Sequence, residues 1–222
     1  MPSVKILEIS DLTHNVRRYT LEKPAGYSFM PGQATELSLD EDGWRDNKHP
    51  FTFTSLADDP TLEFTIKSYF KTGGDGMTER LYGYKPGQSL VLRDVWGTIT
   101  YKGPGVFIAG GAGVTPFIAI LRDLHHNRKL AGHSLIASNR TEADIILRDE
   151  FESFRGLDTI WTVTGDPKSK LLHDRVDANF LKAHIRDFAQ NFYLCGSDPM
   201  VKELRETLKG LGASVENVTW EK

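Results

Sequence analysis

Apolar and polar residues alternate in short runs through the first half of the chain. The runs are VKILEIS (4–10), VRRYTLEK (16–23), ATELSL (34–39), LEFTIKSYF (62–70) and SLVLRDV (89–95). They are rich in β-branched and aromatic residues, and turn signals separate them, most clearly MPGQ at 30–33 and KPGQ at 85–88. Strands at this spacing predict a small antiparallel barrel. One helix interrupts them, because Met77, Leu81 and Tyr84 recur at helical spacing after Asp75, a candidate N-cap.

After Gly103 the pattern changes to strands that alternate with helices. The predicted strand and helix pairs are GVFIAGG with TPFIAILRDLHHN, SLIASN with DIILRDEFESF, and NFYLCGS with DPMVKELRETLKGLG, and TIWTVTG and SVENVTW supply further strands. Strands joined by crossover helices predict a parallel α/β sheet. We therefore expect two domains, residues 1–101 and 102–222, with the boundary near YKGPG at 101–105.

The stretch VFIAGGAGVTPFIAIL, residues 106–121, is the first candidate site. Its glycines, Gly110, Gly111 and Gly113, connect a buried strand to a helix. Such a turn brings backbone N–H groups and the positive end of a helix dipole to one point, which suits a phosphate. The motif GGAGVTP is neither GxGxxG, since Pro116 replaces the third glycine, nor a Walker loop. On this turn alone, a structural connection without a ligand remains the alternative.

A second candidate lies in the first domain. HPFTFTS at 49–55 places an aromatic ring and several hydroxyls on a strand, and GGDGMT at 73–78 opens a helix with glycines and Thr78. That helix start is again suited to a phosphate. Two such turns predict two phosphate-bearing ligands.

Composition and charge narrow the function further. The 222 residues are 39% apolar and 26% charged, with no run long enough to span a membrane and no apolar leader, so we expect a cytoplasmic protein, monomeric by default. A net charge of −3 without a basic run argues against nucleic-acid binding. Cys195 is the only cysteine, so an internal disulfide or a four-cysteine iron–sulfur cluster is excluded. We expect no metal site, because the adjacent His125 and His126 face different directions on a helix.

HPFTFTS, GMTERL, GGAGVTP and YLCGSDPM occur in the order and at the intervals found in one family. By these motifs the chain resembles the ferredoxin–NADP reductase superfamily of flavin-dependent reductases over nearly its whole length. The resemblance implies an N-terminal antiparallel Greek-key β-barrel that binds flavin, followed by a parallel α/β domain that binds a nicotinamide nucleotide. Hydride would pass from NAD(P)H to flavin N5, and electrons would then leave to an acceptor.

The resemblance also assigns residues. Phe51 would lie against the flavin ring, Thr52 near N5, and Cys195 with Gly196 beside the nicotinamide. The cofactor-binding residues it implies are His49, Pro50, Phe51, Thr52, Lys67, Gly76, Met77, Thr78, Gly110, Gly111, Gly113, Thr115, Pro116, Arg140, Asp166, Cys195, Gly196 and Asp198. Thr52, Cys195 and Glu221 are the catalytic candidates, with Glu221 a proton relay.

Several positions depart from the family pattern. His49 and Phe51 stand where Arg and Tyr are usual, and a neutral His lacks the fixed, forked charge of Arg. Lys67 is the candidate to replace that charge, or else a solvated strand lysine. FAD is favoured over FMN because the Thr78 helix is retained.

The chain's last residues, and the residues expected to select the nucleotide, also differ from the family pattern. The aromatic ring that covers the flavin in many relatives is absent after Glu221, so we expect an open nicotinamide side, with Trp220 the alternative cover. Asp166 follows a predicted strand where NADPH-specific relatives carry Ser-Arg, which favours NADH over NADPH, while Arg140 argues for NADPH.

Three functions remain open at this point. The leading one is a reductase that passes electrons to a separate carrier, such as a flavodoxin, a ferredoxin or an oxygenase component. The second is a diaphorase that reduces small acceptors such as ferric chelates, quinones or free flavin. The third is a non-catalytic nucleotide-binding regulator on the same fold.

Overall fold

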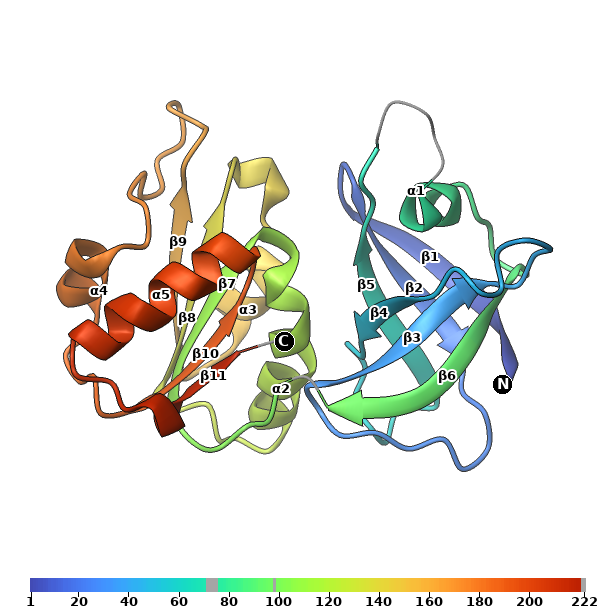
Figure 1. Ribbon diagram of the computed structural model, residues 1–222, viewed down its shortest axis with the longest axis horizontal. Coiled ribbons are helices and arrows are strands. Elements are labelled where there is room, and N and C mark those ends of the chain that lie inside the picture. The colour runs from blue at the N-terminus through green and yellow to red at the C-terminus, as the bar shows by residue number, and fades with distance from the viewer. Residues whose placement is uncertain (71–75, 98, 221–222) are drawn as a thin grey trace.

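The first half of the chain forms an antiparallel sheet in the computed structural model, which describes residues 1–70, 76–97 and 99–220 (Figure 1). Its strands are β1 (Ser3–Thr13), β2 (Val16–Glu22), β3 (Gln33–Leu39), β4 (His49–Thr52), β5 (Thr61–Lys67) and β6 (Ser89–Gly97). Their order is β4-β3-β6-β1-β2-β5. The two outermost strands approach each other where the Thr54 N–H donates to the Glu63 carbonyl at 2.8 Å, which curls the sheet toward a barrel. The antiparallel fold predicted for this half is confirmed.

The repeated PGQ signal forms the same turn twice. The Gln33 N–H donates to the Met30 carbonyl at 3.0 Å, and the Gln88 N–H donates to the Lys85 carbonyl at 3.2 Å. Each glutamine side chain also accepts from the first residue's N–H, at 2.6 Å for Met30 and 2.8 Å for Lys85. The glycine within each turn has a positive φ, which glycine adopts without steric cost.

The second half forms a parallel sheet flanked by helices (Figure 1). Its strands are β7 (Gly105–Gly110), β8 (His133–Asn139), β9 (Leu157–Val163), β10 (Asn191–Cys195) and β11 (Val218–Trp220). The helices are α2 (Thr115–His126), α3 (Arg148–Ser153), α4 (Ala178–His184) and α5 (Asp198–Gly210), with short 3₁₀ turns η1 (Gly111–Val114), η2 (Glu142–Asp144) and η3 (Val215–Asn217). The order β11-β10-β7-β8-β9 reverses direction between β7 and β10, where open α/β sheets bind ligands.

Two predicted helices differ in extent. Helix α3 was expected from Asp144, but it begins at Arg148, because Leu147 adopts a left-handed conformation with φ of 55° and the preceding Ile145 and Ile146 are buried outside the helix. In the first half, α1 (Met77–Tyr82) begins after Gly76, which has no side chain to cap the helix. The candidate cap Asp75 lies outside the described residues. Helix α4 was not predicted.

The expected domain boundary at residues 101 and 102 lies in the connection between β6, which ends at Gly97, and β7, which begins at Gly105. The boundary itself stays a prediction. Within the described ranges, no helix is both long enough and apolar enough to cross a bilayer.

Apolar packing joins the two halves on one side. Val16 and Ile99 belong to the same buried cluster as the inner residues of α2. A Cβ at Gly32 would lie 2.3 Å from the Ile99 carbonyl oxygen and 3.0 Å from the Ile120 side chain, so only glycine allows this close approach. The MPGQ turn therefore helps to seat the barrel against α2.

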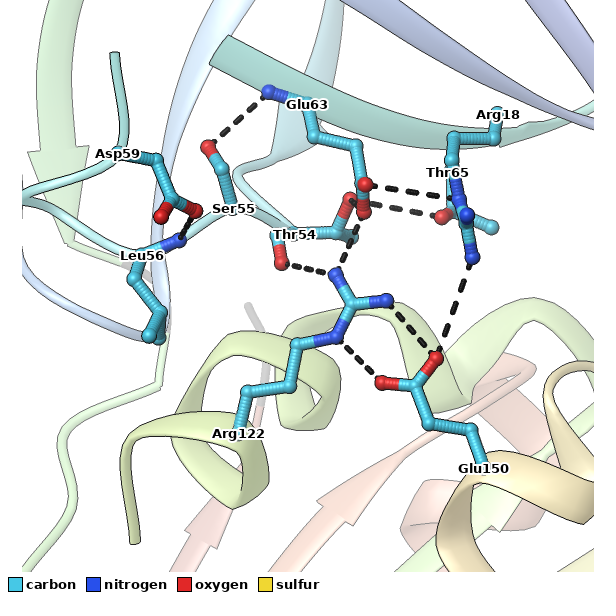
Figure 2. A network of polar contacts seen from close by, with 9 residues as sticks. All are labelled: Arg18, Thr54, Ser55, Leu56, Asp59, Glu63, Thr65, Arg122 and Glu150. Atoms are coloured by element: carbon cyan, nitrogen blue, oxygen red, sulfur yellow. Dashed lines mark hydrogen bonds and ion pairs between the residues drawn. The ribbon is translucent and has the colours of Figure 1, made fainter. Parts of the chain in front are cut away.

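A buried ionic network joins the halves on a second side (Figure 2). Arg122 of α2 has a side chain that is only 17% exposed. It donates to the Thr54 carbonyl at 2.7 Å, to Glu63 of β5 at 2.6 Å and to both oxygens of Glu150 of α3 at 2.5 and 2.9 Å. Burial alone would lower the pKa of Arg122, but the hydrogen bond with Glu150 and the charge of Glu63 raise it above its ordinary value. The guanidinium thus stays charged between two carboxylates.

Removing that guanidinium is expected to destabilise the protein strongly. Arg122→Met leaves the partly buried carboxylates of Glu63 and Glu150 with only the longer ion pairs to Arg18, at 3.4 and 3.9 Å, so we expect the free energy of unfolding to fall by about 2 kcal/mol. Chemical denaturation measures it. Arg148→Met, which breaks more exposed pairs with Glu142 and Glu152, is the matched control and should cost less than about 1 kcal/mol. Equal losses in the two variants would contradict the role given to Arg122.

His133 is buried as a neutral ring inside an aromatic stack. Its Nδ1 donates to the Leu130 carbonyl at 3.0 Å, and Nε2 lies 2.8 Å from the Tyr101 hydroxyl, which is placed to donate to it. The rings of Tyr101 and Phe107 lie parallel to it at 5.7 and 6.1 Å. Burial lowers the pKa of His133 from its ordinary value of 6.5.

This burial predicts acid sensitivity. The unfolded chain protonates His133 near pH 6.5, whereas the folded protein does so only at lower pH. The free energy of unfolding should therefore decrease as the pH falls below that value, down to the lowered pKa. In His133→Gln the decrease should be shallower, whereas His126→Gln, at an exposed position, should keep the original slope. Denaturant unfolding at several pH values tests this, and identical slopes in all three proteins would refute it.

Candidate functional site

A cavity of about 860 Å³ lies between the two sheets. The first half of the chain lines it with His49, Pro50, Phe51, Thr52, Thr65, Ile66, Lys67, Tyr69, Gly76, Met77, Thr78 and Trp96. The second half lines it with Gly110, Gly111, Ala112, Gly113, Thr115, Cys195, Gly196, Ser197, Asp198 and Val201. The cavity therefore brings together all four sequence motifs, which are separated by up to 150 positions in the chain.

Strand β4 forms the wall on the barrel side. Antiparallel pairing with β3 sets Phe51 opposite Thr35 and Thr52 opposite Ala34. Thr52 is buried and Phe51 is half-buried at the cavity surface. The strand's exit is fixed by Thr54, whose carbonyl accepts from Arg122 and whose hydroxyl donates to Glu63 at 2.8 Å. The buried interdomain network thus anchors the segment that carries the motif.

The same network reaches the cavity through a second strand. Thr65 of β5 lines the cavity, and its hydroxyl donates a hydrogen bond to the Thr54 hydroxyl at 3.4 Å (Figure 2). Thr54 in turn donates to Glu63, which accepts from Arg122. A chain of hydrogen bonds therefore links α2 of the second half to both strands on the barrel side of the cavity.

The carboxyl ends of β7 and β10 form the opposite wall. These strands pair in parallel, with Cys195 opposite Ala109, so the turns that follow them meet at the switch point of the sheet. A Cβ at Gly113 would lie 2.3 Å from the Cys195 carbonyl oxygen, and one at Gly110 would lie 2.4 Å from the Met200 sulfur. Backbone packing therefore requires Gly113, whereas the contact at Gly110 is with a flexible side chain that can move aside.

Gly111 differs from its neighbours. It has a φ of 53°, and a Cβ there would meet nothing within 4 Å, so its backbone borders open space. Helix α2, twelve residues long, begins four residues later, and the Thr115 hydroxyl donates to the Ala112 carbonyl at 3.0 Å. The helix dipole makes this end of the cavity suitable for an anion, although the first turn of α2 has few spare donors, because the Thr115 N–H donates to the Ala112 carbonyl and Pro116 has no N–H. The positive φ by itself favours glycine at this position, and the ligand access expected from the sequence stays a prediction.

Charged residues on the barrel side of the cavity are few. His49 Nε2 lies 3.1 Å from the Asn47 side-chain oxygen. The Lys67 ammonium lies 5.8 Å from the centre of the Tyr69 ring, and within residues 1–70, 76–97 and 99–220 it has no carboxylate partner. Lys67 therefore supplies positive charge to the cavity next to His49.

Three of the expected site residues, Pro116, Arg140 and Asp166, do not line this cavity. Pro116 is buried in the first turn of α2. Arg140 and Asp166 follow β8 and β9, at the same carboxyl edge of the sheet but outside the cavity, and Asp166 borders a smaller depression with Gly165. The Asp166 carboxylate accepts from the Lys168 N–H at 3.3 Å. Glu221 lies outside the described residues.

The sequence did not single out several residues that line the cavity: Thr65, Ile66, Tyr69, Trp96, Ala112, Ser197 and Val201. Trp96 is the largest of them, 39% exposed at the end of β6. The sequence signal that could have identified Trp96 is an aromatic residue directly before a glycine at the end of a predicted strand. Trp220, the alternative cover for the flavin, instead stacks under the Arg205 guanidinium of α5, 3.5 Å from the ring centre.

Comparison with known proteins follows the same division of the chain. The family model for the oxidoreductase NAD-binding domain matches residues 107–206. Ferredoxin–NADP reductase B of Sorangium cellulosum is 30% identical, covering 93% of this chain and 90% of that protein. The reductase component of propane 2-monooxygenase from Rhodococcus jostii is 28% identical over 98% of this chain.

Solved structures share the whole fold. A ferredoxin NADP⁺ reductase from Neisseria gonorrhoeae with bound FAD and NADP has a TM-score of 0.86 at 21% identity, covering 99% of this chain and 97% of that one. The FAD/NAD-binding domain of a Vibrio cholerae nitric oxide dioxygenase has a TM-score of 0.88 at 19% identity, covering 99% and 97%. The predicted fold class, an antiparallel flavin-type domain followed by a parallel α/β domain, is confirmed.

The fold and the matched NAD-binding domain define the class of two-domain oxidoreductases. Within that class, this chain belongs to the ferredoxin–NADP reductase family. It spans about three fifths of the length of some relatives, 62% for the Rhodococcus reductase component and 62% for an NADH-cytochrome b5 reductase of Mycosarcoma maydis.

Packing at the glycine turn can be tested directly. Gly113→Ala places a methyl group against the Cys195 backbone, so we expect the free energy of unfolding to fall by about 2 kcal/mol. Gly210→Ala, in α5 with nothing within 4 Å, is the matched control and should raise stability by about 0.5 kcal/mol. Denaturant unfolding measures both. If Gly113→Ala were as stable as Gly210→Ala, the close approach of the turn to β10 would be wrong.

Proposed function

We propose that this protein is a flavin-dependent oxidoreductase that takes hydride from NADH and passes electrons to a separate acceptor. One observation carries the proposal: a single cavity holds the HPFT strand on one wall and the two carboxyl-end turns of the parallel sheet on the other. FAD, when bound, supplies the redox chemistry by accepting hydride and releasing electrons. The protein's residues then provide binding and alignment.

We assign the barrel wall to FAD. Phe51 would present its ring to the flavin, and the buried Thr52 hydroxyl would donate a hydrogen bond near the reacting nitrogen. Lys67, with His49, would offset the negative charge of the phosphates in place of the arginine usual in the family. The backbone at Gly76 to Thr78 would contribute N–H donors.

We assign the opposite wall to the nicotinamide nucleotide. Its pyrophosphate would lie against Gly111 and the start of α2, where the helix dipole favours an anion. Cys195 and Gly196 at the end of β10 would border the nicotinamide. Because both rings would share one cavity, orientation in near contact would supply much of the rate.

The acceptor we favour is an electron-carrier protein. The curated relatives include a reductase component of propane 2-monooxygenase and a ferredoxin–NADP reductase. By analogy, we propose a ferredoxin, a flavodoxin or an oxygenase component as the partner of this chain. A small planar acceptor is the second candidate, favoured by a further cavity described below.

A visible spectrum tests the proposed function. The purified protein should take up FAD and show flavin absorbance bands, and anaerobic addition of NADH should bleach them. Thr52→Val should keep the bands but slow bleaching by about 10- to 100-fold, because it removes one hydrogen bond at the reacting centre. Ser138→Ala, outside the cavity, serves as the control with unchanged bleaching. A protein that binds no flavin would leave only a non-catalytic regulator.

The choice of nucleotide is predicted from Asp166. Its carboxylate would repel the 2′-phosphate of NADPH and would accept from the ribose hydroxyl of NADH, so NADH should give the higher kcat/KM. Asp166→Asn should reduce this preference by about 10-fold, since one repulsive charge is removed while nearby Arg140 remains. Steady-state kinetics with both nucleotides measure the ratio. A strong NADPH preference in the unmodified protein would overturn this assignment.

A further inference from the structure

A second cavity, of about 480 Å³, lies where the end of β6 meets the edge strand β11. Its lining includes Trp96, Lys102, Val215, Glu216, Val218 and Trp220. Val215 is 65% exposed, and the two indoles are partly exposed, so the walls are apolar and open to solvent. None of these residues has been assigned a role in the proposed flavin and nicotinamide sites.

Trp96 connects the two cavities. It lines both the 480 Å³ cavity and the 860 Å³ cavity assigned to flavin and nicotinamide. A molecule in the smaller cavity would therefore be separated from the larger one by a single indole. Such proximity suits electron transfer and has no evident purpose in a purely structural groove.

One polar group of the smaller cavity is a hydrogen-bond donor with spare capacity. The Lys102 ammonium donates to the Glu216 backbone carbonyl at 2.8 Å, which leaves two of its three N–H bonds for other acceptors. The Thr219 hydroxyl is buried away from solvent, so it is not a donor to a ligand in this open cavity. The Glu216 side chain adds one carboxylate, so the lining holds one charge of each sign. An uncharged ligand with carbonyl oxygens matches this set.

The indole of Trp220 gives the cavity a flat, fixed wall. The Arg205 guanidinium covers one face of the ring at 3.5 Å, which holds the indole in place. Val215 and Val218 complete an apolar surface beside it. Flat apolar walls with a few donors select a planar, conjugated molecule over a flexible one.

We propose that this cavity binds a quinone as electron acceptor, with its ring against Trp96 and Trp220 and a carbonyl oxygen toward Lys102. The inference rests on the proposed function and specifies an acceptor for it. In the net reaction, NADH gives two electrons and one proton, as hydride, and solvent gives a second proton, so that NADH becomes NAD⁺ and the quinone becomes a hydroquinone. Electrons and protons balance without another reactant.

Calorimetric binding of menadione to the oxidised, FAD-saturated protein tests the site without turnover. We expect binding of menadione to this form, because FAD fills the larger cavity and leaves the smaller one open. Thr219→Val should leave binding unchanged, because the Thr219 hydroxyl is not accessible from the cavity. Val215→Trp, at an exposed position, should abolish binding by filling the cavity.

Lys102→Gln should weaken menadione binding about 10-fold, whereas Lys85→Gln, at the exposed KPGQ turn, is its matched control and should leave binding unchanged. The rate at which NADH bleaches the flavin should be the same in all four variants. Turnover with hexacyanoferrate should also be unchanged, while the KM for menadione rises with its dissociation constant.

Menadione that binds equally well to Val215→Trp, or that binds only after FAD is removed, would overturn the proposal. If the protein binds no flavin, the proposed function fails, but the same titration on the flavin-free protein still decides the site. Binding that Val215→Trp abolishes and excess FAD does not displace would support the cavity. Binding that FAD displaces would place the quinone in the larger cavity and contradict the inference.

Discussion

The contact between Arg122 and the barrel is the interaction on which the candidate site depends. The guanidinium holds the Thr54 carbonyl and the Glu63 carboxylate of one half against Glu150 of its own half. Because Thr54 follows β4 and Glu63 lies in β5, the contact fixes both barrel strands that face the cavity. Without it, the cavity walls would belong to two sheets joined mainly by the apolar contact around Gly32 and Ile99.

The second constraint is the close approach of two turns at the switch point of the parallel sheet. Gly113 lies against the Cys195 backbone so closely that no side chain fits between them. That packing sets the position of η1 and hence the direction of α2, whose first turn opens onto the cavity and whose middle carries Arg122. The proposed anion-binding end and the Arg122 contact with the barrel are therefore parts of one helix.

Local chemistry allowed much of this architecture to be predicted from the sequence. The PGQ turns depend on hydrogen bonds within four residues, and the glycines between β7 and α2 interrupt a strongly apolar run, so both patterns are visible in the chain. Fifteen of the residues named from the motifs line the cavity. Their binding roles stay proposals.

The remaining features depend on contacts that are distant in the sequence. In the sequence, Arg122 occupies an ordinary polar position on an amphipathic helix. Only folding brings it beside Glu63, which lies 59 residues earlier in the chain. Trp96 likewise becomes a wall between two cavities only when β6 meets β11. Helix α3 begins later than the pattern predicts, because the left-handed conformation of Leu147 has no sequence signature.

Stereospecific isotope transfer tests the central claim, that one rigid cavity aligns the nicotinamide with the flavin. NADH deuterated at either of the two C4 positions would be mixed anaerobically with the FAD-loaded protein, and loss of flavin absorbance would be followed. The account predicts a primary isotope effect for one deuterated form alone, because only one face of the nicotinamide would meet the flavin. Equal isotope effects for both forms, or bleaching that leaves deuterium in NAD⁺ at random, would contradict it.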